Sequence, residues 1–405
     1  MLNKRHIKVR IKFYILLLAV ASAILWGLFF TADVFAAQAE EEAGIIEGQL
    51  NTNEVGKIKE QLEKLPQEDA KEIIPEFDPE KIIKETIKGN SIFDATGIIN
   101  KALFYLLNEI YVNVHVLIKL IVLVVLCAVL KNLQTSFLSD SVGELAFYVC
   151  YVVLISILVV GFNTALNLCR DVIDGMVNFM HACIPPLLTL LMSGGSITTA
   201  GIFQPVLITI VEISASIIKT VFIPVIFIST ILSIVNNISD KLQISKLAGF
   251  LKLISGWGVG LLLTVFVAVV STQGSLGAVV DGVTGKTAKY AVSTFIPVVG
   301  KSLSDAAEAV AGCTVLIKNA AGVAIMAGII IICLIPLLKI LALILLYKLA
   351  CAVVEPISEP RITNCINEMA ASLTLLLGIA ASVMFMFLII VTVIISAGNS
   401  SAMIR

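Results

Sequence analysis

Long apolar runs impose the main constraint on this chain. A helix rises about 1.5 Å per residue, so roughly 20 apolar residues cross the hydrocarbon core of a bilayer. We expect membrane spans at about 114–131, 145–168, 177–193, 202–218, 221–237, 253–271, 322–347 and 372–396. With 58% hydrophobic and 14% charged residues, the chain has more apolar side chains than a soluble domain buries. The expected fold is therefore all-α: a polytopic membrane helix bundle with about six to eight spans.

The first residues have the layout of a secretory signal peptide. Basic side chains within 4–12 precede an apolar run at 13–30, and small residues follow up to Ala36 and Ala39. We expect cleavage after one of these alanines and assign residues 1–36 to the signal peptide. An uncleaved anchor is the alternative, because about 18 apolar residues just span a bilayer. On either interpretation the next segment begins outside the cytoplasm.

Residues 37–94 are expected to form a short acidic, extracytoplasmic helical segment. Residues 40–94 hold 15 acidic and seven basic side chains, a net charge of −8. One helical face carries four apolar residues, Val55, Ile58, Leu62 and Leu65. Two short helices cannot bury a core alone, so we expect docking on a partner or on the membrane surface; a loosely ordered acidic linker is the alternative. Residues 95–113 follow as an amphipathic interfacial helix.

Clustered basic residues indicate which loops face the cytoplasm. Lys241, Lys246 and Lys252 fall in one expected loop, and Lys348 with Arg361 marks another. Basic residues are enriched in cytoplasmic loops, so we place both loops on that side of the membrane.

Four Ile-Pro pairs recur at a regular interval. A spacing of 39 residues separates Pro185 from Pro224, and the same spacing separates Pro297 from Pro336. An Asp-Gly pair lies near each set. We therefore expect an internal repeat of about 110 residues, with broken or re-entrant helices at the prolines, as in transporter and channel folds. The alternatives are a coincidental spacing and simple kinks that help helices pack.

The repeat sets the expected division of the membrane part. Residues 114–238 hold the first repeat, residues 239–354 hold the second, and residues 355–405 form the C-terminal loop and last span. As one helix, the apolar block at 197–238 is about twice as long as the bilayer core is thick. We therefore expect this block to fold back.

Ionisable side chains inside apolar runs are candidates for a transport pathway, because a charge at the bilayer centre costs roughly 2.5–3.5 kcal/mol on insertion scales. Glu212 and Lys219 are seven residues apart, so they share a helix face and are expected to bracket a polar cavity. Snorkelling of Lys219 to an interface is the alternative. The candidate pathway or hinge residues are Pro185, Pro186, Glu212, Lys219, Pro224, Pro297, Pro336 and Lys339.

Two further groups of residues have simpler interpretations. Polar residues cluster where we expect a span to end, at Asn163, Asn167, Arg170, Asp171 and Asp174. We interpret this cluster as a solvated loop mouth, with cation binding by the carboxylates as the alternative. Gly256 and Gly260 form a GxxxG pair and are candidates for close helix packing.

The sequence offers no signal for an enzyme, a cofactor or a metal site. It contains neither HExxH nor GxSxG. The stretch DGVTGKT at 281–287 lacks the first glycine of a nucleotide loop, because Val280 stands there. His181 and Cys183 alone are a weak metal pair. The eight cysteines form no CxxC pair, and no basic patch indicates nucleic acid.

Three stretches carry a family resemblance: HACIPPLLTLLMSGG at 181–195, FIPVVGKSLSDAAEAVAGCTVLIKNAAG at 295–322 and EPISEPRITNCINEMAASLTLLLG at 355–378. With the signal and the acidic segment, the chain resembles the stage III sporulation protein AE family over essentially its whole length. The resemblance implies a multi-pass protein of the mother-cell membrane that faces the forespore. It also implies other stage III A proteins as partners and, through their complex, a forespore membrane protein. The resemblance assigns no catalytic residues.

We therefore expect an integral membrane subunit of the channel or secretion-like complex between mother cell and forespore. Its repeats are expected to form or gate the conduit. One alternative is a stand-alone secondary transporter of a small metabolite or ion. Another is a membrane scaffold that anchors soluble partners through residues 40–94. The chain is also a candidate homo-oligomer.

Overall fold

The fold is known from a computed structural model, which describes residues 53–65, 77–89, 95–136, 140–238, 244–295 and 300–403. The regular secondary structure of these residues is entirely helical. The predicted signal peptide and Pro297 lie outside the described residues.

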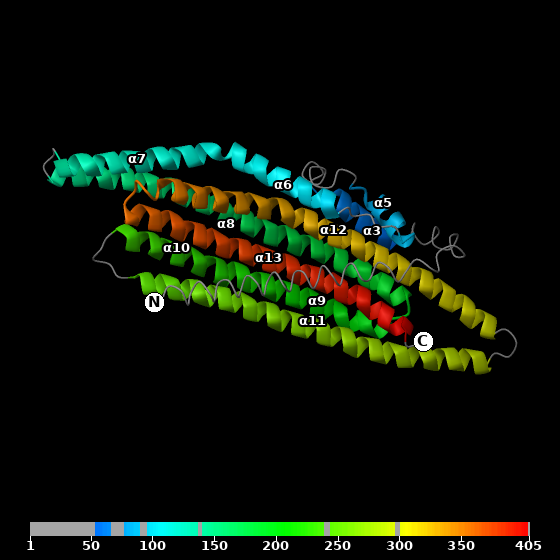
Figure 1. The fold of residues 1–405 in the computed structure, drawn as a ribbon. Coiled ribbons are helices and arrows are strands. Elements are labelled where there is room, and N and C mark those ends of the chain that lie inside the picture. Colours follow the sequence, from blue (N-terminus) through cyan, green and yellow to red (C-terminus); the bar gives the residue numbers. More distant parts are fainter. Residues whose placement is uncertain are drawn as a thin grey trace.

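The long helices lie side by side in one elongated bundle (Figure 1). In chain order the helices are α3 Asn53–Glu63, α5 Pro79–Ile87, α6 Ala95–Val112, α7 Val114–Ser136, α8 Asp140–Ser193, α9 Ile197–Ile217, the π-helix η1 Ile218–Phe222, α10 Ile223–Ile238, α11 Ser245–Phe295, α12 Gly300–Val354 and α13 Pro360–Met403. Helices α8, α11 and α12 contain 54, 51 and 55 residues. At about 1.5 Å per residue each is roughly 80 Å long, well over the thickness of a bilayer core.

Six helical stretches among the described residues are long and apolar enough to cross a membrane. They are Val114–Asn132, Tyr148–Ser193, Ile197–Asn237, Ser245–Gln273, Ala309–Val354 and Pro360–Ala397. This agrees with a polytopic, all-α membrane bundle and with the lower of the expected span numbers.

Two of the expected span divisions are wrong. The stretches 145–168 and 177–193 belong to the single helix α8, and 202–218 and 221–237 belong to one continuous run through α9, η1 and α10. This run therefore does not fold back. Helix α11 contacts both α9 and α10, whereas α8 contacts α9 and α13 contacts α10, so long neighbouring helices support the run over its length.

Most of the prolines singled out in the sequence do not end a helix. Pro185 and Pro186 lie inside α8, and Pro336 lies inside α12, so the expected breaks at these positions are wrong. A proline inside a helix removes a backbone hydrogen bond, but packing compensates for this loss. At the α8 site the flanking Ile184 and Leu187 are each only 1% exposed.

Pro224 marks the one π-helical segment of the described chain. The five residues of η1 precede it, and the amide of Ile223 donates to the carbonyl of Ile218. Pro224 has no amide hydrogen, so it cannot continue the α-helical pattern of bonds at that point. The internal repeat stays a prediction, because Pro297, the counterpart of Pro185, lies outside the described residues.

The turn between α8 and α9 is fixed from two directions. Gly195 has φ 90°, a left-handed conformation that glycine adopts without strain and that ends α8. Ser196 makes no side-chain capping bond at the start of α9. Instead, the buried carboxylate of Asp281 on α11 accepts hydrogen bonds from the backbone amides of Thr198 and Thr199, with N–O distances of 2.9 Å in both. A distant helix thus supplies the cap.

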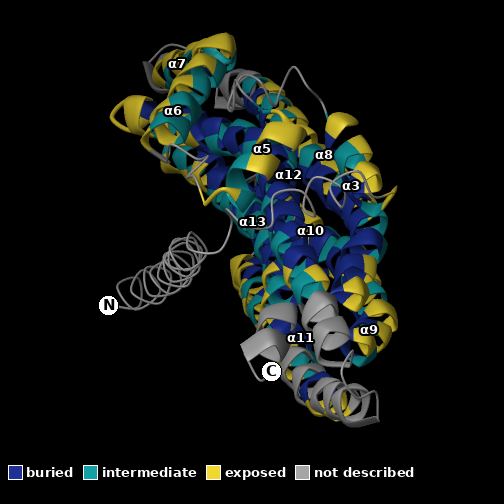
Figure 2. Cartoon of the chain, turned by 90° about the vertical axis from the view of Figure 1, so that its right-hand side faces the viewer, coloured by how far each residue is buried: buried dark blue, intermediate teal, exposed yellow. Residues whose placement is uncertain are grey.

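Helix α13 lies at the centre of the bundle, where it contacts α8, α10, α11 and α12. Figure 2 shows the buried residues gathered between these helices. The close helix approach expected at Gly256 occurs instead at Gly258, where an added Cβ would lie 2.5 Å from the ring of Phe222. At Gly256 an added Cβ would meet no described atom within 4 Å. The role of Gly260 stays a prediction.

The short N-terminal helices dock on the chain's own bundle. Helix α3 contacts α8 and α12, and α5 contacts α12. Val55, Ile58 and Leu62 of α3 are fully buried. An added Cβ at Gly328 of α12 would lie 2.7 Å from Cδ2 of Leu62 and 2.8 Å from Cζ of Phe179, so this glycine makes room for α3. The docking partner of this described part is therefore the bundle itself.

Helix α6 has two apolar sides rather than one. Ala102 and Leu106 pack against Ile335 and Leu338 of α12. The opposite side exposes a row of large apolar residues: Ile99, Leu103, Phe104, Leu107 and Tyr111. An apolar side exposed on a membrane protein is suited to lipid.

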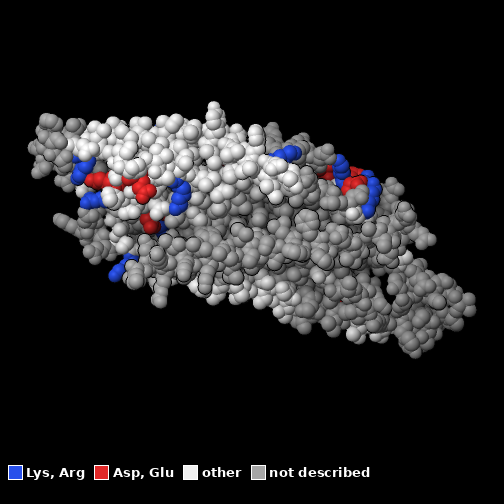
Figure 3. All heavy atoms as spheres, in the orientation of Figure 1, with Lys and Arg blue, Asp and Glu red and all other residues white. Residues whose placement is uncertain are grey.

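Charged side chains gather at two places on the face shown in Figure 3. One lies over α3 and α5, where Lys84 approaches Glu80 to 2.6 Å. The other lies near the turn from α12 to α13, where Lys131 lies 3.3 Å from Glu359. Between the two places, the described atoms of this face are mostly uncharged, as a lipid-facing band requires.

Candidate functional site: a polar face on helices α8 and α9

The outward side of α8 changes character near its middle. Its N-terminal half exposes large apolar residues: Leu145, Val149, Val152, Val153 and Val160. Its C-terminal half exposes polar residues: Asn163, Asn167, Arg170, Asp171, Asp174 and Asn178. The spacings follow the helical period, so the polar residues form one stripe. The first half is suited to lipid, and the second half to water or a polar partner.

Helix α9 and η1 lie against this stripe and carry polar residues of their own. The exposed or partly exposed members are Thr209, Glu212, Ser216, Lys219 and Thr220. We call the α8 stripe, His181 and these residues the polar face. The two helices run in opposite directions and contact each other along their length.

Two pairs of ionisable side chains cross from α8 to α9 and η1, and the pair of His181 with Glu212 is an ion pair only when the imidazole is protonated. Nζ of Lys219 pairs with Oδ1 of Asp174. Nε2 of His181 lies 3.1 Å from Oε1 of Glu212, in ion-pair range although not aligned as a hydrogen bond. Both helices space their members by seven residues, so the pairs form two rungs about two turns apart.

The rungs lie at the surface of the chain. The side chains of Lys219 and Asp174 are 36% and 51% exposed, and those of His181 and Glu212 are 31% and 62% exposed. All four belong to stretches that are long and apolar enough to cross a membrane. Exposed charges on such helices need water or another protein beside them, because lipid solvates charge poorly.

Sequence reasoning identified one side of each rung and missed the other. Glu212 and Lys219 were expected to bracket a cavity, and they do face the same way, but toward the outside of the chain. Asp174 was placed in a loop mouth and His181 was set aside. The loop-mouth interpretation is wrong, because Asp174 lies in the interior of α8. The matching separations of seven residues could have revealed the pairing.

The other candidate residues lie at different places. Pro185 and Pro186 follow His181 in α8, and Pro224 follows Lys219 directly after η1. Pro336 and Lys339 lie in α12, beside the residues that pack on α6. No contact described for the chain joins these two to the polar face. Their roles stay predictions.

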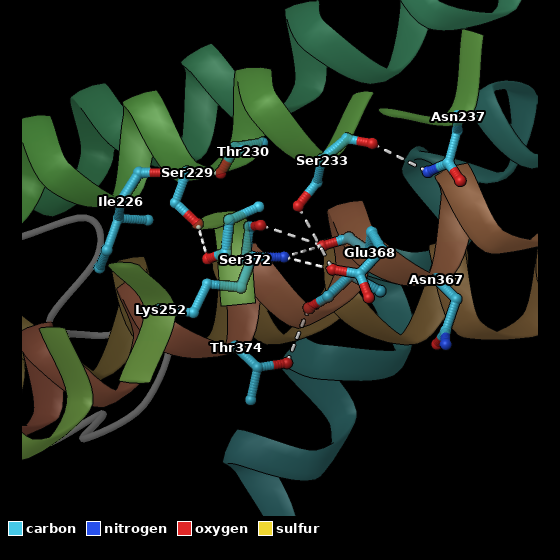
Figure 4. A network of polar contacts seen from close by, with 12 residues as sticks. Ile226, Ser229, Thr230, Ser233, Asn237, Lys252, Asn367, Glu368, Ser372 and Thr374 are labelled. Atoms are coloured by element: carbon cyan, nitrogen blue, oxygen red, sulfur yellow. Dashed lines mark hydrogen bonds and ion pairs between the residues drawn. The ribbon is translucent and has the colours of Figure 1, made fainter. Parts of the chain in front are cut away.

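A second polar cluster lies inside the bundle, where α10, α11 and α13 meet (Figure 4). The side chain of Lys252 on α11 is 5% exposed, and its Nζ pairs with Oε2 of Glu368 on α13. Nζ also donates to the carbonyl of Glu368 at 3.3 Å, and Ser233 of α10 donates to the carboxylate at 3.5 Å. The loop position expected for Lys252 is therefore wrong; this residue ties three helices together.

Lys318 is another buried lysine, and sequence reasoning did not single it out. It is fully buried in α12, and its Nζ donates to the carbonyl of Ile395 on α13 at 2.8 Å. Within the described residues, no three His, Cys, Asp or Glu side chains come together as a metal site. The buried polar groups thus join helices, and the outward polar groups form the polar face.

The helices and their apolar surfaces define an all-α, multi-pass membrane protein. The sequence profile of the family described as stage III sporulation protein AE matches residues 77–398. The stage III sporulation protein AE of Bacillus subtilis (strain 168) is 34% identical over 323 residues, which cover 80% of this chain and 81% of that protein. The chain therefore belongs to the stage III sporulation protein AE family. No solved structure matches it.

The matched range places the polar face within the family. Helices α8 and α9 fall inside the matched residues 77–398, whereas α3 lies before the first matched residue. The chain is accordingly a membrane protein of sporulation, and nothing in its described site indicates catalysis.

Proposed function

We propose that this chain is a mother-cell membrane subunit of the complex that connects mother cell and forespore, and that its polar face lines or gates a water-filled path. Its partners are then other stage III A proteins and, through the complex, a forespore membrane protein. The N-terminal segment lies on the extracytoplasmic side. Family membership supports the setting, and the two rungs on the polar face carry the proposal for a path.

The argument for a path outside the single chain rests on packing. Helix α13 is buried among four neighbours, so the middle of the bundle is filled by side chains. A surface hollow of about 380 Å³ lies between α9 and α11, and its lining is mostly apolar, with Pro205, Ile210 and Val269 among the residues. The polar groups suited to water lie instead on the polar face. A path therefore forms where this face meets another subunit.

The test compares spore formation after two substitutions on α9: one removes a charge of the polar face, and the other changes the adjacent apolar residue as a control. Glu212→Leu removes one side of a rung, whereas Ile213→Leu changes an exposed apolar residue on the same helix. We expect Glu212→Leu to lower the number of heat-resistant spores at least about tenfold, the change that about 1.4 kcal/mol produces in an equilibrium. The amount of protein in the membrane should stay the same for both variants.

Lys219→Leu should reproduce this loss, because it removes a side of the other rung. Wild-type spore numbers in both rung variants, at normal protein level, would contradict a path along this face. A stand-alone transporter is tested by uptake into liposomes that hold the purified chain alone, where we expect no uptake.

The scaffold alternative is tested by deleting α3. This helix is occupied by contacts with α8 and α12, so we expect its removal to destabilise the bundle rather than to release soluble partners. Loss of partners from an otherwise stable chain would favour the scaffold.

A further inference from the structure

Two charges on the polar face have no partner in the chain as described. Arg170 and Asp171 are both exposed, and neither makes a hydrogen bond or an ion pair with any described residue. They are consecutive residues of α8, in the apolar stretch Tyr148–Ser193. The nearby Asp174, in contrast, is neutralised by Lys219. The stripe thus offers one positive and one negative group that are free to pair with another molecule.

The position of Arg170 and Asp171 along the membrane normal indicates which molecule pairs with them. Copies of one membrane protein insert in the same orientation, so their symmetry axis runs along the membrane normal and equal depths meet. Consecutive helix residues differ by only about 1.5 Å in rise. Arg170 of one copy therefore lies level with Asp171 of another, and the reverse pair lies at the same depth.

The remaining residues of the stripe are also complementary to themselves. Asn163, Asn167 and Asn178 are exposed on α8. An amide side chain carries both a donor and an acceptor, so each asparagine can bond to the same asparagine of a second copy. Polar side chains of this kind join helices in membranes.

We propose that a second copy of this chain packs on the α8 stripe, with Arg170 of each copy paired to Asp171 of the other. This proposal rests on the proposed function in one respect: it identifies the subunit that closes the path as a second copy of this chain. Asp174 is itself a member of the stripe, so its rung with Lys219 lies at the contact, and the path runs beside the contact along α9. The copies pair through charge and amide groups rather than through a broad apolar surface.

A charge swap tests the pairing in the full chain. Arg170→Asp places two acidic residues level with two others across the contact, and Asp171→Arg does the same with basic residues. Two differently tagged copies are co-expressed, extracted in mild detergent and pulled down through one tag. We expect each single variant to recover at least about tenfold less of the other copy than the wild type does, because like charges oppose association.

The double variant Arg170→Asp with Asp171→Arg should restore recovery, because it re-creates opposite charges at the same depth. Within one chain the double variant has no such benefit, since its new carboxylate at position 170 lies one turn from Asp174. The control is the double swap Glu54→Lys with Lys57→Glu on α3, which exchanges an exposed pair 3.0 Å apart and should leave recovery unchanged. Single variants that match the wild type, or a double variant that fails to restore recovery, overturn the proposal.

A crosslinking measurement covers the case in which detergent separates the copies. Asn167→Cys on the stripe should give crosslinked dimers in native membranes with a short bifunctional maleimide, above the level of the wild-type chain. Trp257→Cys, at an exposed position of α11, should not. Crosslinking at Trp257→Cys without crosslinking at Asn167→Cys also overturns the proposal.

Spore counts of the same strains separate this proposal from the proposed function. If the double swap restores pairing while every strain sporulates normally, the copies pair as proposed and the path fails. If the chain does not self-associate but Glu212→Leu blocks sporulation, the path stands and another subunit closes it, which overturns the second copy.

Discussion

The interior of the bundle and the polar face use charge in opposite ways. Inside, Lys252 is only 5% exposed; it pairs with Glu368, which is 44% exposed, and together with Ser233 the pair joins three helices. On the polar face, Asp174 and Lys219 are 51% and 36% exposed and join only two helices. A buried ion that loses its partner is costly, whereas an exposed pair contributes little to stability. We infer that the interior pair maintains the fold and that the polar face serves the function.

The largest expected effect comes from breaking the interior pair on its acidic side. Glu368→Leu removes the carboxylate that pairs with the buried ammonium of Lys252. Because the side chain of Glu368 is 44% exposed, we expect a loss in the free energy of unfolding toward the lower end of the about 3–5 kcal/mol that breaking a buried pair costs. Thermal unfolding of the purified chain in detergent would measure it. Adding Lys252→Met should recover most of this loss, because the buried charge is then gone as well. A double variant no more stable than Glu368→Leu would contradict this explanation.

A smaller effect is expected where the interior is apolar. Gly328→Ala places a methyl group 2.7 Å from Leu62 and 2.8 Å from Phe179, so we expect overpacking to cost about 1–3 kcal/mol. The readout is proteolysis of α3, which should become faster while the remainder of the chain stays intact. Gly312→Ala is the matched control, because an added Cβ there meets nothing within 4 Å.

The polar face should give the reverse result. Asp174→Asn with Lys219→Gln removes an exposed rung and should change the free energy of unfolding by only about 0.2–1 kcal/mol. Spore formation should nevertheless fall, because the rung borders the path. A loss of stability as large as that of Glu368→Leu would show that the rung maintains the fold, and the comparison would fail.

The smallest effect concerns the charges of α3 and α5, which lie outside the membrane-spanning stretches. Lys84, and then Lys59, lower the pKa of Glu80 below its ordinary value of 4.5. Because the pKa is lower in the folded state, the contribution is present above pH 4.5 and is lost as the pH falls through the folded-state pKa. Protection of the α5 amides against hydrogen exchange should decrease slightly at such acid pH. Glu80→Gln should abolish that decrease.

The helices were predictable from the sequence, but their continuity was not. Apolar runs of sufficient length identify the membrane helices, and charges inside such runs identified Glu212 and Lys219. The breaks expected at Pro185 and in the block at 197–238 did not occur, because a local proline signal is weaker than packing along long neighbouring helices. The decision between a kink and a break depends on contacts that the local sequence does not contain.

The interior contacts were beyond prediction for the same reason. Lys252 and Glu368 lie 116 residues apart, and Thr199 and Asp281 lie 82 apart, with no shared local pattern. The two rungs were easier to predict, because their members are seven residues apart on each of two neighbouring helices. They were missed because the charged residues of α8 were taken as the end of a span.

The most direct test of the account is the size of the reagent that reaches the α9 side of the polar face. Cysteines introduced at Ser216, which is exposed on α9, and at Val152 of α8 are treated with a small hydrophilic maleimide and with a bulky polymer-linked maleimide in sporulating cells. We predict that only the small reagent labels position 216, as in a narrow water-filled path, and that neither labels position 152, which faces lipid. Equal labelling of position 216 by both reagents would place it in open water, and no labelling would place it in lipid; either result would contradict the account.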